Sequence, residues 1–244
     1  MINKKLPANW EKQHPTLLND LRLRYIYHTN AIEGNSLSLI ETKVILSDGI
    51  TVGGKKLSEH LEAINQADAL DFIEESVKKG TSISQAFIRE LHFYVLNHDE
   101  TNRGKYREKS VFIEGADTIT ALPSTIPSRL DNIIEAYNNN KLEHGVIYAV
   151  SRFHADFEEI HPFIDGNGRT GRLIMNLELL KAGYPITIIE KDDRPIYYES
   201  LETAQTGERN IEPLMTFIEQ SINKTVSFID KKLNQYLSQE NLER

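Results

Sequence analysis

A segment near the middle of the chain, HPFIDGNGRTGR at residues 161–172, brings together residue types that can hold a polyphosphate. Its Gly-Asn-Gly tripeptide at 166–168 stands between two predicted helices, where backbone N–H groups at a helix N-terminus can converge on an anion. Arg169 and Arg172 fall in the first turns of the second helix and project from one face. Cations are unfavourable at a helix N-terminus, so this pair indicates that phosphates lie between them.

Two other side chains of the segment indicate a reaction. Asp165 would repel phosphates unless a divalent cation bridges the two, so its position implies Mg²⁺ or a similar hard ion. His161 has a pKa range suited to taking a proton from an attacking hydroxyl near neutral pH. The combination predicts phosphoryl or nucleotidyl transfer.

Each of these features alone has a commoner structural explanation. A histidine at a helix end usually caps or packs, Gly-Asn-Gly is usually a turn, and paired arginines usually form surface salt bridges. Together, eight specified positions at roughly 5% each give a chance match on the order of 10⁻¹⁰ per window. A metal cluster built from the histidines and aspartates between His154 and Asp165 is disfavoured, because the i, i+4 pairing of a helical zinc motif is missing.

The elements around this segment are predicted to be helical. Apolar residues recur at helical spacing almost throughout the chain, which indicates a mainly α fold. One predicted helix, over about 143–160, runs into His161, and the next one ends at Gly183. The exception is 103–122, where β-branched residues flank the turn sequence EGAD and predict a short β-hairpin. An isolated two-stranded ribbon is marginal, so this hairpin must lie against the helices or a ligand.

Composition sets the organisation of the chain and excludes several functions. The 244 residues carry a net charge of −8, so no overall attraction to nucleic acid or an anionic membrane is expected. There is no cysteine, which excludes disulfides and thiolate metal sites, and no apolar run suits a signal peptide or a membrane span. We expect a cytoplasmic protein with an N-terminal helical extension at 1–80, a core domain at 81–244, and no nucleic-acid or membrane partner.

The segment at 161–172 matches HxFx(D/E)GNGRxxR, the signature of the Fic family, at every specified position, so the chain resembles Fic proteins. These are mostly α-helical enzymes that use ATP to attach AMP to a hydroxyl side chain of a target protein. The resemblance implies a Fic-fold helical bundle with a short β-hairpin flap, His161 as general base and Asp165 as the Mg²⁺ ligand. It assigns the nucleotide to Asp165, Gly166, Asn167, Gly168, Arg169, Thr170, Gly171 and Arg172.

The resemblance also gives roles within that set and outside it. Backbone amides and the Asn167 side chain would bind the α- and β-phosphates, and Arg172 would reach the γ-phosphate. The part of the predicted hairpin at about 111–122 resembles the family's flap, which pairs with the backbone of the target protein like an added strand. The resemblance places four further residues near the nucleotide: Ile113, Glu114, Tyr197 and Gln205.

A second segment, TNAIEGN at 29–35, resembles the inhibitory motif (S/T)xxxE(G/N) of autoinhibited Fic proteins. By this resemblance Glu33, with Thr29 and Asn35, belongs to an inhibitory helix, and Glu33 pairs with Arg172. A bidentate pair of arginine and carboxylate is geometrically favourable, and it would occupy the cation meant for the γ-phosphate. Without the resemblance, Glu33 would be interpreted as an ordinary acid before a helix-terminating glycine.

The expected function is therefore protein adenylyl transfer from ATP with Mg²⁺, autoinhibited by Glu33, with self-modification once inhibition is relieved. A hydrolase that removes AMP at the same site is the alternative among enzymes, motivated by the same glutamate. A regulatory module that senses ATP without turnover is the alternative among binding proteins. The resemblance also allows a homodimer.

Overall fold

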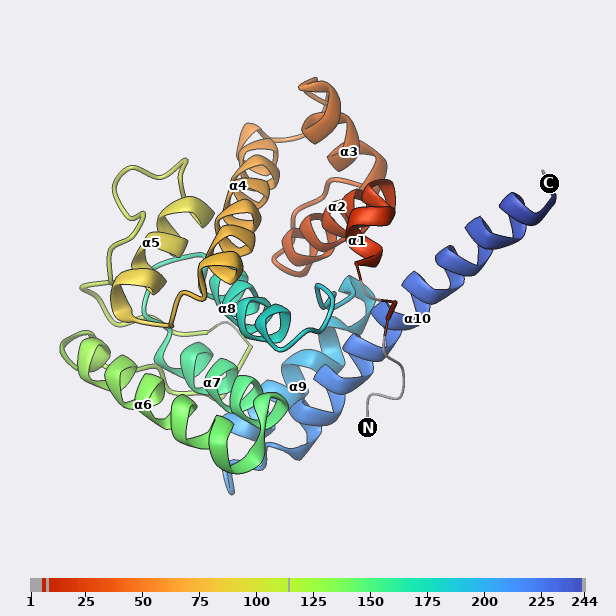
Figure 1. Cartoon of the computed structure of the whole chain (residues 1–244). Helices are drawn as coiled ribbons and strands as arrows, with labels where there is room; N and C mark the ends of the chain where they lie inside the picture. Colours follow the sequence, from red (N-terminus) through yellow and green to blue (C-terminus); the bar gives the residue numbers. More distant parts are fainter. Residues whose placement is uncertain (1–5, 8, 114, 243–244) are drawn as a thin grey trace.

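The structure, a computed structural model, describes residues 6–242 apart from residues 8 and 114 (Figure 1). The described residues form an all-helical fold. Its α-helices are α1 (Trp10–Gln13), α2 (Pro15–Ile32), α3 (Leu39–Asp48), α4 (Leu57–Lys79), α5 (Gln85–Val95), α6 (Ile126–His144), α7 (Val146–Ile160), α8 (Asn167–Lys181), α9 (Arg194–Gln205) and α10 (Glu212–Leu242). Two single 3-10 turns, η1 (Pro123–Thr125) and η2 (Lys191–Asp193), lead into α6 and α9.

Local sequence signals set several helix ends. Ser38 and Glu41 form a capping box at the start of α3, in which each side chain accepts from the backbone N–H of the other residue. Helix α4 ends at Gly80, whose φ of 64° is left-handed and favours glycine. Gly145, with φ 85°, separates α6 from α7, so the helix predicted from residue 143 begins at Val146 instead.

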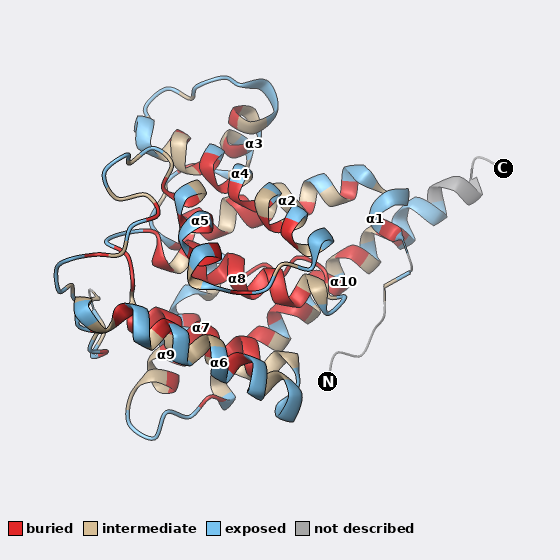
Figure 2. Ribbon diagram, turned by 60° about the vertical axis from the view of Figure 1, so that its left-hand side comes forward, coloured by how far each residue is buried: buried red, intermediate tan, exposed pale blue. Residues whose placement is uncertain are grey.

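Helices α7 and α8 form the centre of the molecule. They pack against each other, with α6, α9 and α10 against α7 and α2, α4 and α5 against α8. Figure 2 shows buried residues concentrated along these two helices, whereas the C-terminal end of α10 extends away from the body in Figure 1. The loop that joins α7 to α8 therefore starts and ends on the most buried elements of the fold.

Helix α8 is buried on most of its surface, including polar residues that need internal partners. Asn176 accepts from the Thr187 N–H at 2.6 Å and donates to the Thr187 carbonyl at 3.1 Å. Glu178 accepts from the Tyr137 hydroxyl at 2.6 Å and from Lys141 at 2.9 Å. These bonds fix the C-terminal half of α8 against its neighbours.

The predicted β-hairpin at 103–122 is not present as a paired ribbon, because the described residues of this segment contain no strand. The Ala116 N–H donates to the Ile113 carbonyl at 3.3 Å and closes a turn. Beyond the turn, the segment takes partners from α9: the Asp117 N–H donates to Glu202 Oε1 at 2.9 Å. A two-stranded ribbon is marginal alone, and these contacts to α9 hold the segment as an extended loop instead.

None of the described helices combines the length and the apolarity that crossing a bilayer requires.

Candidate functional site

The loop between α7 and α8 carries the motif and is held from several sides. His161 caps α7 in a left-handed conformation with φ 49°, and its N–H donates to the Phe157 carbonyl at 3.0 Å. Arg107 Nε donates to the His161 carbonyl at 2.7 Å. Phe163 is fully buried, and its ring stacks on His92 with centroids 3.6 Å apart. The backbone of His161 is thereby fixed, and its side chain faces a cavity.

Asn167 stabilises the loop with its side chain. Its amide accepts from the Phe163 N–H and donates to the Phe163 carbonyl, both at 2.9 Å. In the free protein this side chain therefore bonds within the loop, and its contact with phosphate stays a prediction. The first backbone N–H groups of α8 have no partner inside the helix, because its ladder begins with the bond from Thr170 N–H to Gly166 O. Those amides remain available to an anion.

Arg172 connects the motif to the N-terminal helices. Its side chain is 1% exposed, and Nε donates to Thr29 Oγ1 at 2.8 Å. Nη2 donates to the Thr29 carbonyl at 2.9 Å and to Glu33 Oε1 at 2.7 Å. The buried Nη1 has no partner among the described residues. Burial alone would lower the pKa of Arg172, but Glu33 beside it raises the pKa well above the ordinary value.

The carboxylate of Glu33 also covers the start of α8. A Cβ added to Gly168 would collide with Glu33 Oε1 and would lie 2.9 Å from Arg172 Nη1. This is where the macrodipole and the free N–H groups of a helix favour an anion. The carboxylate of Glu33 therefore lies beside the anion site of the motif.

Asp165 is the one candidate metal ligand of the motif, and its side chain is 64% exposed. Oδ1 accepts from the Gly166 N–H at 2.6 Å, and Arg169 Nη2 lies 3.4 Å from the carboxylate. Within the described part of the chain, no group of three or more acids and histidines could hold a metal. Mg²⁺ is often bound by one carboxylate together with water and substrate phosphates, so Asp165 fits this ion only jointly with a nucleotide.

A cavity of about 420 Å³ opens beside the loop. Among its lining residues are Glu33, Ile113, Glu158, His161, Gly168, Arg172, Tyr197, Tyr198 and Gln205. The structure thus brings residues of the motif, of α9 and of the end of α2 to one cavity. Glu33 and Gln205, which both line it, are 172 positions apart in the sequence.

Several predicted site residues have other contacts than expected. The hydroxyl of the buried Tyr197 lies 2.6 Å from His154 Nε2, so the adjacent and more exposed Tyr198 is the more accessible aromatic ring. Gln205 accepts from Thr118 Oγ1 at 2.8 Å and donates to the Ala155 carbonyl at 2.9 Å. Its amide therefore links the loop before α6 to α7.

Four further residues were assigned to the site, and the structure describes three of them. Asn35 bonds to Glu62 and to the Glu59 carbonyl on α4, so it positions the end of α2 and does not contact Arg172. Gly171 packs against Glu158 and the His154 ring, so it contributes close packing. Thr170 Oγ1 is buried without a partner among the described residues. Glu114 lies outside the described residues.

The ring of His161 is suited to accept a proton. Burial lowers its pKa, so the ring is neutral near pH 7. Nδ1 lies 3.3 Å from the Glu158 carbonyl, a geometry in which Nδ1 carries the hydrogen and donates it. Nε2 then has the free lone pair that a general base needs.

Three residues of this region were not predicted from the sequence to belong to the site: Glu158, Tyr198 and His92. Two of them had a positional signal, because Glu158 lies one helical turn before His161 and Tyr198 follows Tyr197 directly. His92 is 73 residues from Asp165, and no spacing in the sequence links them.

His92 is predicted to be essential for loop stability. Its Nδ1 accepts from the Gly104 N–H at 3.0 Å, which leaves the Nε2 hydrogen to donate to the Asp165 carbonyl at 2.9 Å. His92→Phe keeps an aromatic ring at this position but leaves both backbone groups unsatisfied, so we expect the free energy of unfolding to fall by about 2 kcal/mol or more. Urea denaturation measures this. The exposed His144→Phe should change it by less than about 0.5 kcal/mol, and equal effects at the two positions would show that His92 has no special role.

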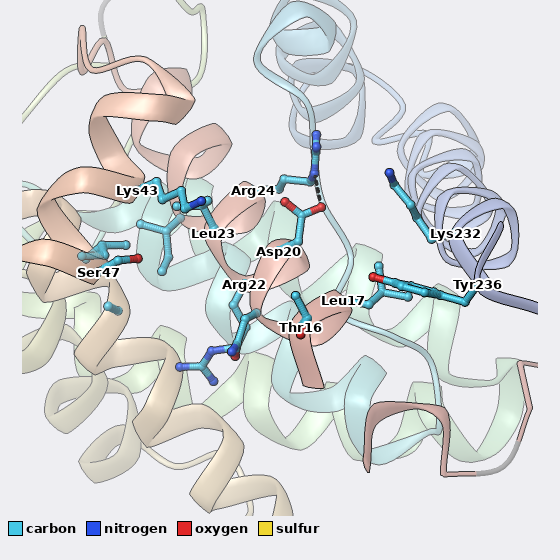
Figure 3. Close-up of a pocket in the computed structure, with 14 residues that line it drawn as sticks. Thr16, Leu17, Asp20, Arg22, Leu23, Arg24, Lys43, Ser47, Lys232 and Tyr236 are labelled. Atoms are coloured by element: carbon cyan, nitrogen blue, oxygen red, sulfur yellow. Dashed lines mark hydrogen bonds and ion pairs between the residues drawn. The ribbon is translucent and has the colours of Figure 1, made fainter. Parts of the chain in front are cut away.

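A larger groove of about 650 Å³ lies between α2, α3 and α10 (Figure 3). An ion pair between Arg24 and Asp20, 3.0 Å apart, lines it together with Lys43, Lys232 and Tyr236. None of the predicted site residues lines this groove. Size alone therefore does not identify the site, whereas the convergence of predicted residues does.

Known proteins resemble this chain in the region that contains the motif. The sequence model of the Fic/DOC family matches residues 82–179, which include the whole motif. A fragment of Fic-1 from C. elegans has the same fold with a TM-score of 0.84 and 30% identity, over 96% of this chain and 69% of that one. This chain belongs to the Fic/DOC family.

Other Fic proteins match over most of this chain. Protein adenylyltransferase Fic from Aedes aegypti is 38% identical over 209 residues, covering 84% of this chain and 41% of that protein. The same enzyme from Drosophila grimshawi is 37% identical over 207 residues, covering 83% and 42%. The chain thus spans about two fifths of these curated relatives. A Fic domain protein from Bacteroides thetaiotaomicron shares the fold at a TM-score of 0.82 and 24% identity, over 91% of this chain and 90% of that one.

Proposed function

We propose that this chain is a protein adenylyltransferase that moves AMP from ATP to a hydroxyl side chain of a protein target. The observation that carries the proposal is the convergence of a neutral His161, the free N-terminus of α8 and Arg172 on one cavity. The names of the relatives from Aedes and Drosophila support the same activity.

In this reaction His161 Nε2 takes the proton of the target hydroxyl. The hydroxyl oxygen then forms a bond to the α-phosphorus of ATP, and the bond from that phosphorus to the bridging oxygen breaks to release pyrophosphate. Backbone N–H groups at the start of α8 bind phosphate oxygens, and Arg172 pairs with the terminal phosphate. Mg²⁺, held by Asp165 together with the phosphates, would neutralise part of the charge on the leaving group.

The extended loop before α6 is proposed to present the target. It carries two highly exposed apolar side chains, Phe112 at 94% and Ile119 at 85%. An extended segment with free backbone groups can pair with a second extended chain, which is the strand addition expected of a flap. We infer that the strands expected here, which the described residues of this loop do not form, appear only when the target peptide supplies the pairing.

The N-terminal extension at 1–80 is proposed to inhibit the core domain at 81–244. Glu33 lies 2.7 Å from Arg172 and close to Gly168, which supports the inference that its carboxylate competes with an ATP phosphate for this position. Productive binding of ATP then requires Glu33 to leave. Thr29, which accepts from Arg172 Nε, keeps the guanidinium oriented in the inhibited state.

The proposed function is tested by incubating the protein with Mg²⁺ and ATP labelled at the α-phosphate. Label that stays on protein after denaturation supports adenylyl transfer. ATP binding without label in any variant would favour the ATP-sensing module, and release of free AMP from an AMP-modified protein would favour the hydrolase. The position of Glu33 in the cavity supports the hydrolase as the alternative function, because its carboxylate could orient a water for attack.

A further inference from the structure

Glu158 is a buried carboxyl group in the wall of the candidate active site. It lies in the last turn of α7, is 8% exposed and lines the same cavity as Glu33, His161 and Arg172. Its Oε1 is buried and has no hydrogen-bond partner among the described residues. An unsatisfied buried oxygen disfavours the charged form of the carboxyl, because no donor replaces the lost water.

The packing around Glu158 keeps its carboxyl in place. A Cβ added to Gly171 would lie 2.5 Å from Glu158 Oε1 and 2.9 Å from the His154 ring. Glycine at this position of α8 therefore leaves the space that the carboxyl occupies. The main chain of Glu158 also bonds to the ring of His161, so the acid and the proposed base are held by the same turn of helix.

The surroundings favour the uncharged form of this acid. Burial raises the pKa of Glu158 to about 8; Arg172 on α8 opposes this shift and Glu33 at the end of α2 adds to it. His154 on α7 and Tyr197 on α9 are uncharged at neutral pH, because burial lowers the pKa of His154 to about 3 and raises that of Tyr197. The other ionisable residues that line the cavity are His161, Arg194, Tyr198, Glu199 and Glu202.

An uncharged carboxyl in a cavity that accepts a polyanion has a chemical use. In its ionised form it would repel phosphates, whereas in its protonated form it can donate one hydrogen bond to an oxygen of the ligand. We propose that Glu158 contacts the bound nucleotide as a carboxylic acid and donates a hydrogen bond to one of its oxygen atoms. This inference rests on the proposed function, since it assumes that ATP enters this cavity.

The test uses the Glu33→Gly protein, in which Arg172 is free, and measures ATP affinity by calorimetry with Mg²⁺ between pH 6 and 9. Two further substitutions are compared in that background: Glu158→Gln, which keeps an N–H donor but cannot ionise, and Glu158→Leu, which removes the donor. Loss of Glu33 removes one negative neighbour, so the pKa of Glu158 in this background is lower than in the wild-type protein.

Because ATP binds to the protonated form, affinity should be highest at low pH and fall as the pH rises through the pKa of Glu158. We expect a loss of up to about tenfold per pH unit above that pKa. The Glu158→Gln protein should show no such loss once the titration of ATP itself is subtracted. The Glu158→Leu protein should bind roughly tenfold more weakly than its parent at pH 6.

A stability measurement shows that the variants fold. The pKa of Glu158 is 4.5 in the unfolded chain and about 8 in the folded protein. Between these values the unfolded chain has lost the proton while the folded protein keeps it, so the free energy of unfolding of the wild-type protein falls as the pH rises from 4.5 toward 8. Glu158→Gln removes this loss, so its urea midpoint at pH 8 should equal or exceed that of its parent.

The outcomes separate this inference from the proposed function. If the Glu33→Gly protein does not bind ATP, both are wrong. If it binds and transfers AMP, but Glu158→Leu leaves its affinity unchanged at pH 6, only the contact by Glu158 is overturned. The same holds if Glu158→Gln keeps the pH profile of its parent, because another group must then titrate.

Discussion

Replacing Glu33 with glycine is expected to raise the rate of AMP transfer from ATP by on the order of 100-fold, if Glu33 occupies Arg172 in about 99% of the molecules. In the resting protein Arg172 is buried, and three of its donated hydrogen bonds go to Thr29 and Glu33. Removing the carboxylate leaves a buried cation whose natural partner is an anion, which the terminal phosphate of ATP can supply. The rate of label transfer, or of self-modification by intact mass, measures the effect.

The matched control is Glu143→Gly, which removes a carboxylate from the exposed last turn of α6 and introduces the same residue at a helix end. It should leave the rate unchanged. Glu33→Gln should be intermediate, because the amide keeps one oxygen acceptor near Arg172 but carries no charge. A Glu33→Gly protein that binds ATP and transfers AMP no faster than the wild-type protein would exclude the inhibitory role.

Adding His161→Ala to the Glu33→Gly protein is expected to lower AMP transfer by about 10²- to 10⁴-fold, the usual effect of losing a general base. ATP affinity should change little, because the phosphates are held by α8 and Arg172. Burial lowers the pKa of His161, so the base form already predominates at pH 6.5. At saturating ATP, the rate should therefore rise with pH only below 6.5 and show no further rise above it.

His144→Ala, on the exposed end of α6, serves as the matched control and should keep full activity. If the His161→Ala protein still transferred AMP at the rate of its parent, another group would have to accept the proton. A rate that rises with pH well above 6.5 would also be inconsistent with a depressed pKa at His161.

The helical class of the fold and the position of the motif could be predicted from the sequence, because both rest on local patterns. Apolar spacing gave the helices on either side of the motif, and Gly-Asn-Gly at 166–168 marked the loop between them. The pairing of Glu33 with Arg172 spans 139 positions, and only the resemblance to a known motif suggested it.

The remaining features depend on tertiary contacts that no local pattern encodes. The resemblance assigned the side chain of Asn167 to phosphate, and no local pattern indicated that it bonds to the backbone of Phe163 in the free protein. β-branched residues at 103–122 favour strands, yet Glu202 on α9 competes for the backbone. The burial of Glu158 depends on the absence of a side chain at Gly171, a contact between two helices.

The central claim is that Glu33 and the terminal phosphate of ATP compete for Arg172. Calorimetric titration of ATP and AMP into the wild-type and Glu33→Gly proteins tests it most directly, because AMP lacks the phosphate that needs this arginine. We expect Glu33→Gly to strengthen ATP binding by more than about tenfold and AMP binding by less than about threefold. An equal gain for both nucleotides, or no gain for ATP, would contradict it.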